Sequence, residues 1–220
     1  MCSSYDRRIE SHAPIELPIF ELPVAIVPAE KVPLHIFEQR YLAMIAHCLE
    51  DVSPFGFLFR DDDGPRSIGC SAMVSEVVER HEDGRLDVVV TGAHPFAVLD
   101  RYEAPEWPEG RVHQLEIDEP TLATREPLRD ARAAFAELLD AVGAQAERAD
   151  AAPHAFAIAA QIEMPPDEKQ ALLEAANEGD RLVALEHTLR KLLAGVKRSR
   201  ELGERAKTNG HSPGQIGPIR

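Results

Sequence analysis

The sequence has few cysteines and no long apolar run, and both absences narrow the class of protein. Its three cysteines, Cys2, Cys48 and Cys70, include no closely spaced pair. Disulfide frameworks use paired cysteines, so we interpret all three as reduced thiols. No apolar run approaches the roughly 20 residues that span a bilayer, and the N-terminus lacks the apolar core of a signal peptide. We therefore expect a soluble, cytoplasmic protein without membrane contact.

Lysine is also scarce, and no lysine follows a glycine. The five lysines, at positions 31, 169, 191, 197 and 207, follow Glu, Glu, Arg, Val and Ala. A phosphate-cradling G-x-x-x-x-G-K-[ST] loop requires Gly immediately before Lys, so this ATPase motif is absent. We expect no bound cofactor.

Positive charge is sparse except near the C-terminus. Residues 190–220 contain eight basic and two acidic residues, which leaves 16 basic against 36 acidic residues in the first 189. A body with a net charge of −20 repels phosphate backbones, so we expect no nucleic-acid partner. RNA binding is the disfavoured alternative.

Hydrophobic residues make up 44% of the chain, enough for an ordinary core, and their spacing differs between two parts. Residues 55–118 contain short apolar runs separated by Asp63-Gly64 and Asp83-Gly84, which are hairpin signals because Gly accepts positive φ. Among these runs are 96–102 and 112–117. Many short strands at even spacing predict a small barrel or sandwich.

Residues 17–45 combine extended pieces with a helix. Prolines recur evenly there, which suits short strands at sheet edges because proline donates no ladder hydrogen bond. They are Pro18, Pro23, Pro28 and Pro33. From Ile36 the apolar residues recur every three or four positions, which predicts a helix that covers one opening of the sheet. Its apolar face consists of Phe37, Tyr41, Met44, Ile45, Cys48 and Leu49.

After Pro120 the apolar spacing is helical throughout. One stripe runs from Leu128 to Val142 and stops at Gly143, and a short helix follows around residues 156–162. Pro165 and Pro166 open a third helix. Leucines recur at helical spacing from Leu182 to Val196, and this apolar spacing does not continue beyond Val196. The last helix should therefore pack along its first half and then protrude or fray. The predicted division is a flexible N-terminus (1–14), a β-rich part (15–120), a helical part (121–205) and a disordered tail (206–220).

Several motifs resemble the N-terminal, substrate-binding domain of the Lon protease family. They are LPIFELPVAIVP from Leu17, PLHIFEQRYLAMI from Pro33, FGFL, IGCSAMV, DGRLDVVVTGAHPF ending at Phe96, and MPPDEKQALLEAANEGDRLVAL from Met164. The resemblance covers about residues 15–200. It implies an α+β fold, in which a PUA-like β pseudobarrel with one covering helix is followed by a C-terminal helical bundle. Pro95 departs from the family, which usually carries Arg before the Phe.

The resemblance also implies a function. The family's Ser and Lys protease dyad lies on a separate domain, for which no sequence remains, so the chain looks like a free-standing recognition domain without enzymatic activity. It implies a non-catalytic protein- or peptide-binding role, with an adaptor in protein quality control as the suggested setting. The expected partners are unfolded or extended polypeptide segments or one protein partner, and the expected state is a monomer or weak homodimer.

Trp107 is the candidate binding residue, because it is the only Trp and its loop is flanked by prolines. The alternative is a loop tryptophan that covers the core. Glu38 and Arg40 lie two apart and do not share a helix face, so we expect them to cap or brace the junction of sheet and helix. We assign structural roles to Pro33, Phe37, Glu38, Arg40, Tyr41, Gly69, Gly92 and Phe96.

Other candidate metal-binding or catalytic motifs in the sequence are incomplete. His47 and Cys48 have no second pair at ligand spacing, and Arg85 replaces the second His of an H-E-x-x-H motif at His81. Ser71 lacks the second Gly of a nucleophile elbow, and residues 61–63 suit a solvated turn. We therefore expect no metal and no catalytic residue. A hydrolase whose site assembles only in space is the open alternative.

Overall fold

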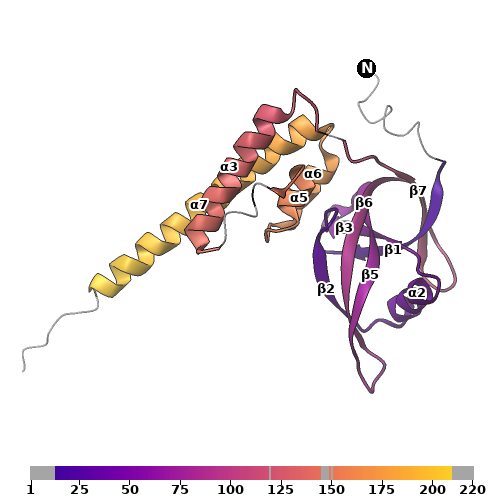
Figure 1. Cartoon of the computed structure of the whole chain (residues 1–220). Helices are drawn as coiled ribbons and strands as arrows, with labels where there is room; N and C mark the ends of the chain where they lie inside the picture. The colour runs from indigo at the N-terminus through magenta and orange to yellow at the C-terminus, as the bar shows by residue number, and fades with distance from the viewer. Residues whose placement is uncertain (1–12, 119, 145–148, 150, 210–220) are drawn as a thin grey trace, which may run out of the picture.

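The computed structural model describes residues 13–118, 120–144, 149 and 151–209. The first part of the chain forms a sheet with one helix, and the last part forms helices packed together (Figure 1). The predicted α+β class and its order, β-rich part first, are confirmed. Most of the segments expected to be a flexible N-terminus and a disordered tail lie outside the described residues.

Five strands close into a ring. They follow the order β1, β7, β6, β5 and β3, and β1 pairs back onto β3 in parallel, while the other pairings are antiparallel. β2 adds to β6, and the two-residue β4 adds to β3. The strands are β1 (Ile15–Leu22), β2 (Lys31–Ile36), β3 (Phe55–Asp61), β4 (Gly64–Pro65), β5 (Ile68–Arg80), β6 (Leu86–Glu103) and β7 (Pro108–Gln114).

Pro33 and two glycines of the β-rich part lie in an edge strand and in turns, where their backbone properties are tolerated or needed. Pro33 lies in β2, which pairs on one side with β6, so its missing N–H need not remove a ladder bond. Gly64 and Gly84 have φ values of 109° and 88° in the predicted turns. The strand expected at residues 96–102 is continuous with residues 86–95 and forms one strand, β6, which continues through Pro95 while its outer partner changes from β2 to β7.

A small apolar cluster joins four strands of the ring. It consists of Leu17, Ile19, Leu58, Phe96 and Val112. Gly69 lies beside it, where a Cβ would stand 2.5 Å from the carbonyl oxygen of Phe57 and 2.7 Å from Cζ of Phe96. The close approach of the aromatic ring to the neighbouring strand therefore requires glycine at this position.

Helix α2 (Gln39–Glu50) covers the sheet on the side away from the long helices (Figure 1). Its buried residues are Tyr41, Met44, Ile45 and Cys48, all of them on the predicted face. The assignment of Phe37 to that face is wrong, because its side chain is 62% exposed. The chain is still extended at Ile36, the last residue of β2, and Glu38 at the N-cap has φ −76° and ψ 132°, so Phe37 precedes the helix.

The helical part consists of α3 (Arg125–Val142), α5 (Ala155–Ala159), α6 (Pro166–Glu174) and α7 (Glu178–Asn209). α3 and α7 lie side by side, and α5 and α6 lie between them and the strands (Figure 1). α3 ends at Gly143, whose φ is 75°. Side chains 197–204 of α7 are exposed, so this helix packs along its first part only. It continues to Asn209, past the position where a tail was expected to begin.

Buried polar contacts join the two parts. Lys169 of α6 forms an ion pair with Glu30, which precedes β2, and Glu30 also accepts a hydrogen bond of 3.1 Å from the backbone N–H of Val27. Gln170 donates a hydrogen bond of 3.0 Å to the carbonyl oxygen of Ile68 in β5. Both contacts attach α6 to the sheet. No helix in the described part of the chain is long and apolar enough to span a membrane.

Candidate peptide-binding surface

Trp107 lies in the loop between β6 and β7 and packs on helix α2. Its ring stacks on the imidazole of His47, with the centroids 5.1 Å apart and the planes at 23°. The side chain is half-buried and also contacts the main hydrophobic core. Pro105 and Pro108 flank it and restrict the loop. The tryptophan is therefore held in one orientation with part of its ring accessible.

The surface between this loop and α2 is an open groove of about 540 Å³, which we call the α2 groove. Ala43 and Ala46 are exposed there, and their small side chains leave space above the surface of the helix. The complete lining is Gln39, Arg40, Ala43, Ala46, His47, Glu50, Glu106 and Trp107. A mostly apolar groove with charged groups along it suits an extended chain segment better than a small enclosed ligand.

Arg40 and Glu38 form an ion pair beside the α2 groove. The Nε of Arg40 donates to Oε2 of Glu38 at 3.2 Å, and the guanidinium lies 4.5 Å from the ring centroid of Tyr41. The two residues meet because Glu38 is the N-cap residue, where the backbone is extended; its side chain makes no capping hydrogen bond. Both side chains are about half exposed, so the pair stabilises the fold by at most about 1 kcal/mol.

The remaining motif residues do not converge on the α2 groove. Pro33 and Phe37 are exposed, on and just after β2, and Phe96 is buried against Gly69. Gly92 exchanges backbone hydrogen bonds of 2.9 Å with residues 29 and 30. Of the eight, Glu38, Arg40 and Tyr41 lie at or next to the groove.

The side chain of Ser71 is hydrogen-bonded to the backbone, and the two described cysteines are buried, as is typical of residues with a structural role. Ser71 Oγ donates to the carbonyl oxygen of His94 and accepts from its N–H, both at 3.1 Å. Cys48 and Cys70 are buried, and burial raises the pKa of both thiols. A nucleophilic cysteine needs a lowered pKa, so neither thiol has the environment of a catalytic residue.

One side-chain group was missed by sequence reasoning. His35, His81 and Asp87 come together, with Nδ1 of His35 at 2.5 Å and Nε2 of His81 at 2.8 Å from the two carboxylate oxygens. The hydrogen bond from His35, followed by that from His81, holds the pKa of Asp87 below its ordinary value. The H-E-x-x-H pattern at His81 depends only on residues close in the sequence, whereas this group joins distant ones. The strand register, which pairs His35 with Asp87, is the signal that could have found the group.

The fold is an α+β domain, in which a pseudobarrel with a surface groove precedes packed helices. Residues 16–191 match the family model described as the ATP-dependent protease La (LON) substrate-binding domain, so the chain belongs to this family. The resemblance seen in its motifs is thereby confirmed. A comparison with the curated proteins gave no significant match.

Two solved structures show the same fold. The N-terminal domain of the Mycobacterium avium complex Lon protease has a TM-score of 0.69 at 17% identity, over 80% of this chain and 98% of that one. A Lon N-terminal domain protein from Xanthomonas campestris has a TM-score of 0.58 at 23% identity, over 78% of this chain and 96% of that one.

Proposed function

We propose that the chain binds unfolded or extended polypeptide segments in the α2 groove and serves as an adaptor in protein quality control. The observation that carries the proposal is the position of Trp107, a fixed aromatic side chain on a mostly apolar groove in a member of a substrate-binding family. Aromatic side chains held in place bind with little loss of conformational entropy, which is why they dominate binding hot spots.

The dimensions of the α2 groove set the length of the segment. Arg40 lies near the start of α2 and Glu50 is its last residue, so about 15 Å of helix separates the two charges at 1.5 Å per residue. An extended chain covers that length with about four or five residues. We expect affinities in the micromolar range, since so short a segment buries little surface.

The test is the binding of fluorescently labelled, extended model peptides, followed by anisotropy. Trp107→Ala should weaken binding by at least about tenfold, because truncation of an aromatic anchor costs about 2 kcal/mol. Leu122→Ala is the matched control, since Leu122 is 77% exposed and does not line the groove. Equal affinity of the wild type and Trp107→Ala, with both folded by circular dichroism, would reject the groove as the binding surface.

A second candidate is docking to one folded protein through α7. An apolar groove of about 270 Å³ lies between α3 and α7. Its apolar lining is Phe135, Leu138, Leu139, Val142, Ile162, Leu192 and Val196. The exposed, basic part of α7 begins at the residue after Val196. Deletion of residues 197–220 should abolish co-purification with such a partner, and unchanged co-purification would reject this version.

A further inference from the structure

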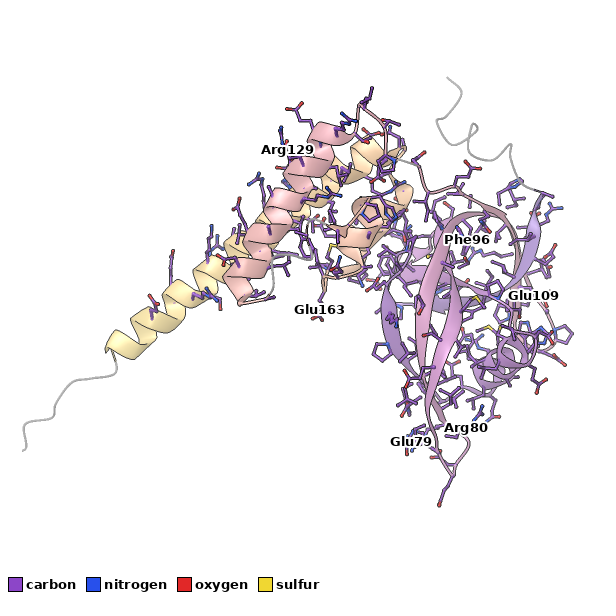
Figure 2. The ribbon with its side chains drawn as sticks, in the orientation of Figure 1. Glu79, Arg80, Phe96, Glu109, Arg129 and Glu163 are labelled. Atoms are coloured by element: carbon purple, nitrogen blue, oxygen red, sulfur yellow. The ribbon has the colours of Figure 1, made fainter. Side chains whose placement is uncertain are left out.

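The group formed by His35, His81 and Asp87 is separate from the α2 groove, since none of the three residues lines that groove. Of the three, His81 lines a different pocket together with Leu42 and Ala46 of α2. His35 is in β2, Asp87 is at the start of β6, and His81 directly follows β5. Figure 2 labels Glu79 and Arg80, which mark this distal end of the β5–β6 hairpin. Two paired strands and the residue after a third therefore bring their side chains to a single point on the surface.

The geometry points to a binding site for one divalent transition-metal ion, with zinc as the best match, and we propose that His35, His81 and Asp87 are its ligands. One ligand atom from each residue lies within 4.8 Å of the others. Two imidazole nitrogens and a carboxylate oxygen form a ligand set that zinc favours, and water can complete the tetrahedron. The side chains are 45%, 24% and 32% exposed in that order, which gives the ion a path from solvent.

The hydrogen bonds from His35 and His81 to Asp87 span the space that the metal ion would fill. Zinc binds nitrogen and oxygen at about 2.0–2.1 Å, which places ligand atoms of a tetrahedron about 3.3 Å apart. The separations of 2.5 and 2.8 Å to Asp87 are slightly shorter. Side-chain rotations can open this spacing, and each ligating nitrogen gives up the proton it shares with the carboxylate, either to the other nitrogen of its ring or to solvent.

Glu79 supplies an outer contact of the kind that metal-binding histidines have. Its Oε1 lies 3.6 Å from Nδ1 of His81, the ring nitrogen that faces away from Asp87, and the register pairs Glu79 with Asp87 across the two strands. A histidine that binds metal through one nitrogen commonly donates the other N–H to a carboxylate. The turn is also fixed, because His81 N–H donates to the Arg85 carbonyl at 2.9 Å.

Arg85 is the group that opposes the ion. Its Nη1 lies 3.5 Å from Nε2 of His35, and its Nε is held by Asp83 at 2.8 Å. A fixed positive charge next to a ligand disfavours a second cation. Arg85→Gln should therefore bind the metal more tightly than the wild type, an increase that loss of a merely structural contact does not predict.

The test is calorimetric titration of the tag-free full chain with zinc chloride near neutral pH, supported by the visible spectrum of bound cobalt. We expect one ion per chain and at least about tenfold weaker binding in each of His35→Gln, His81→Gln and Asp87→Asn. His47→Gln is the matched control, because His47 lies 3.4 Å from Asp51 in an exposed pair outside the cluster.

Unfolding midpoints in urea, measured without metal, separate ligand loss from misfolding. The proposal holds if zinc raises the midpoint of the wild type and of His47→Gln but not that of the three cluster variants. It is overturned if the wild type binds no stoichiometric zinc, or if the three variants bind as the wild type does, since either result places no metal on these residues.

Discussion

The β-rich and helical parts bury different kinds of side chain. The β-rich part is filled by large apolar groups, including Phe55, Phe57 and Phe96, each at most 1% exposed. Glycines pack directly against such groups, as at Gly69. The helical part buries Phe135 and Phe156 among many alanines and leucines and also encloses charged groups, of which Arg181 is 0% exposed. The first part therefore depends on close fit, and the second depends in addition on paired charge.

Arg181 is buried and contacts a carboxylate, a backbone carbonyl and an aromatic ring. Its Nη1 lies 2.6 Å from Glu178, its Nε donates to the carbonyl oxygen of Leu172 at 3.0 Å, and the group lies 4.4 Å from the ring centroid of Phe156. Glu178 in turn accepts a hydrogen bond of 2.7 Å from Ala155 N–H. One ion pair thus joins α5, α6 and α7.

The largest effect should come from breaking this pair. Arg181→Met leaves Glu178 buried without its cation, so we expect the free energy of unfolding to fall by about 3–5 kcal/mol in urea denaturation. Arg190→Met on the same helix is the control, because its pair with Glu186 is exposed and contributes about 0.5 kcal/mol or less. Equal losses for the two variants would contradict the importance of burial.

The ion pair between the two parts should rank second. Lys169→Met removes the cation from Glu30, which keeps its hydrogen bond to Val27, so we expect a loss of about 1.5–3 kcal/mol. A double-mutant cycle with Glu30→Gln, followed by urea denaturation, measures the coupling between the two side chains. Strictly additive losses would show that the pair does not link α6 to the sheet.

A single methyl group should have opposite effects in the two parts. In Gly92→Ala the new Cβ would lie 2.2 Å from the carbonyl oxygen of Val27, so the backbone must shift and stability should fall by about 1–3 kcal/mol. Gly195→Ala in α7 meets no atom within 4 Å and should raise stability by about 0.5–1 kcal/mol. Thermal unfolding of both variants checks the signs, and a stable Gly92→Ala would disprove the close fit.

The smallest effect concerns Glu168, which connects α6 to α7. The hydrogen bond of 2.7 Å from Thr188 and the 2.9 Å contact with Lys191 hold the pKa of Glu168 below its ordinary value. Because the pKa is lower in the folded state, this contribution to stability is present above the ordinary pKa and is lost as the pH falls through the folded value. Thr188→Val should raise the pKa of Glu168 in an NMR titration.

The corresponding change in stability should be below about 1 kcal/mol near neutral pH, because Glu168 is partly exposed. Lys191→Met, which removes the second partner of the carboxylate, should shift the pKa in the same direction. A pKa that is the same in Thr188→Val and in the wild type would show that the hydroxyl does not act on the carboxylate.

The parts of the fold that follow local rules could be predicted from the sequence. Turn glycines, the stop of α3 at Gly143 and the buried face of α2 from Tyr41 onward all depend on residues close in the chain. Phe37 was misplaced for an instructive reason. Its spacing of four from Tyr41 fits a helix, but strand pairing extends to Ile36, and that long-range contact decides where the helix begins.

Contacts between distant segments could not be predicted in the same way. Lys169 and Glu30 are 139 positions apart, and their pairing depends on how α6 docks on the sheet. The group of His35, His81 and Asp87 likewise depends on strand register rather than on a motif. Trp107 could be singled out by its rarity, but the stacking on His47 that fixes it required the position of α2.

The most direct test of the proposed binding surface is hydrogen–deuterium exchange of the full chain with and without a saturating extended peptide. The α2 groove and the groove between α3 and α7 lie on different parts of the molecule, so protection distinguishes them. We predict slower exchange in residues 39–50 and 104–107 when peptide is bound. Protection confined to α3 and α7, or unchanged exchange throughout, would contradict binding at Trp107.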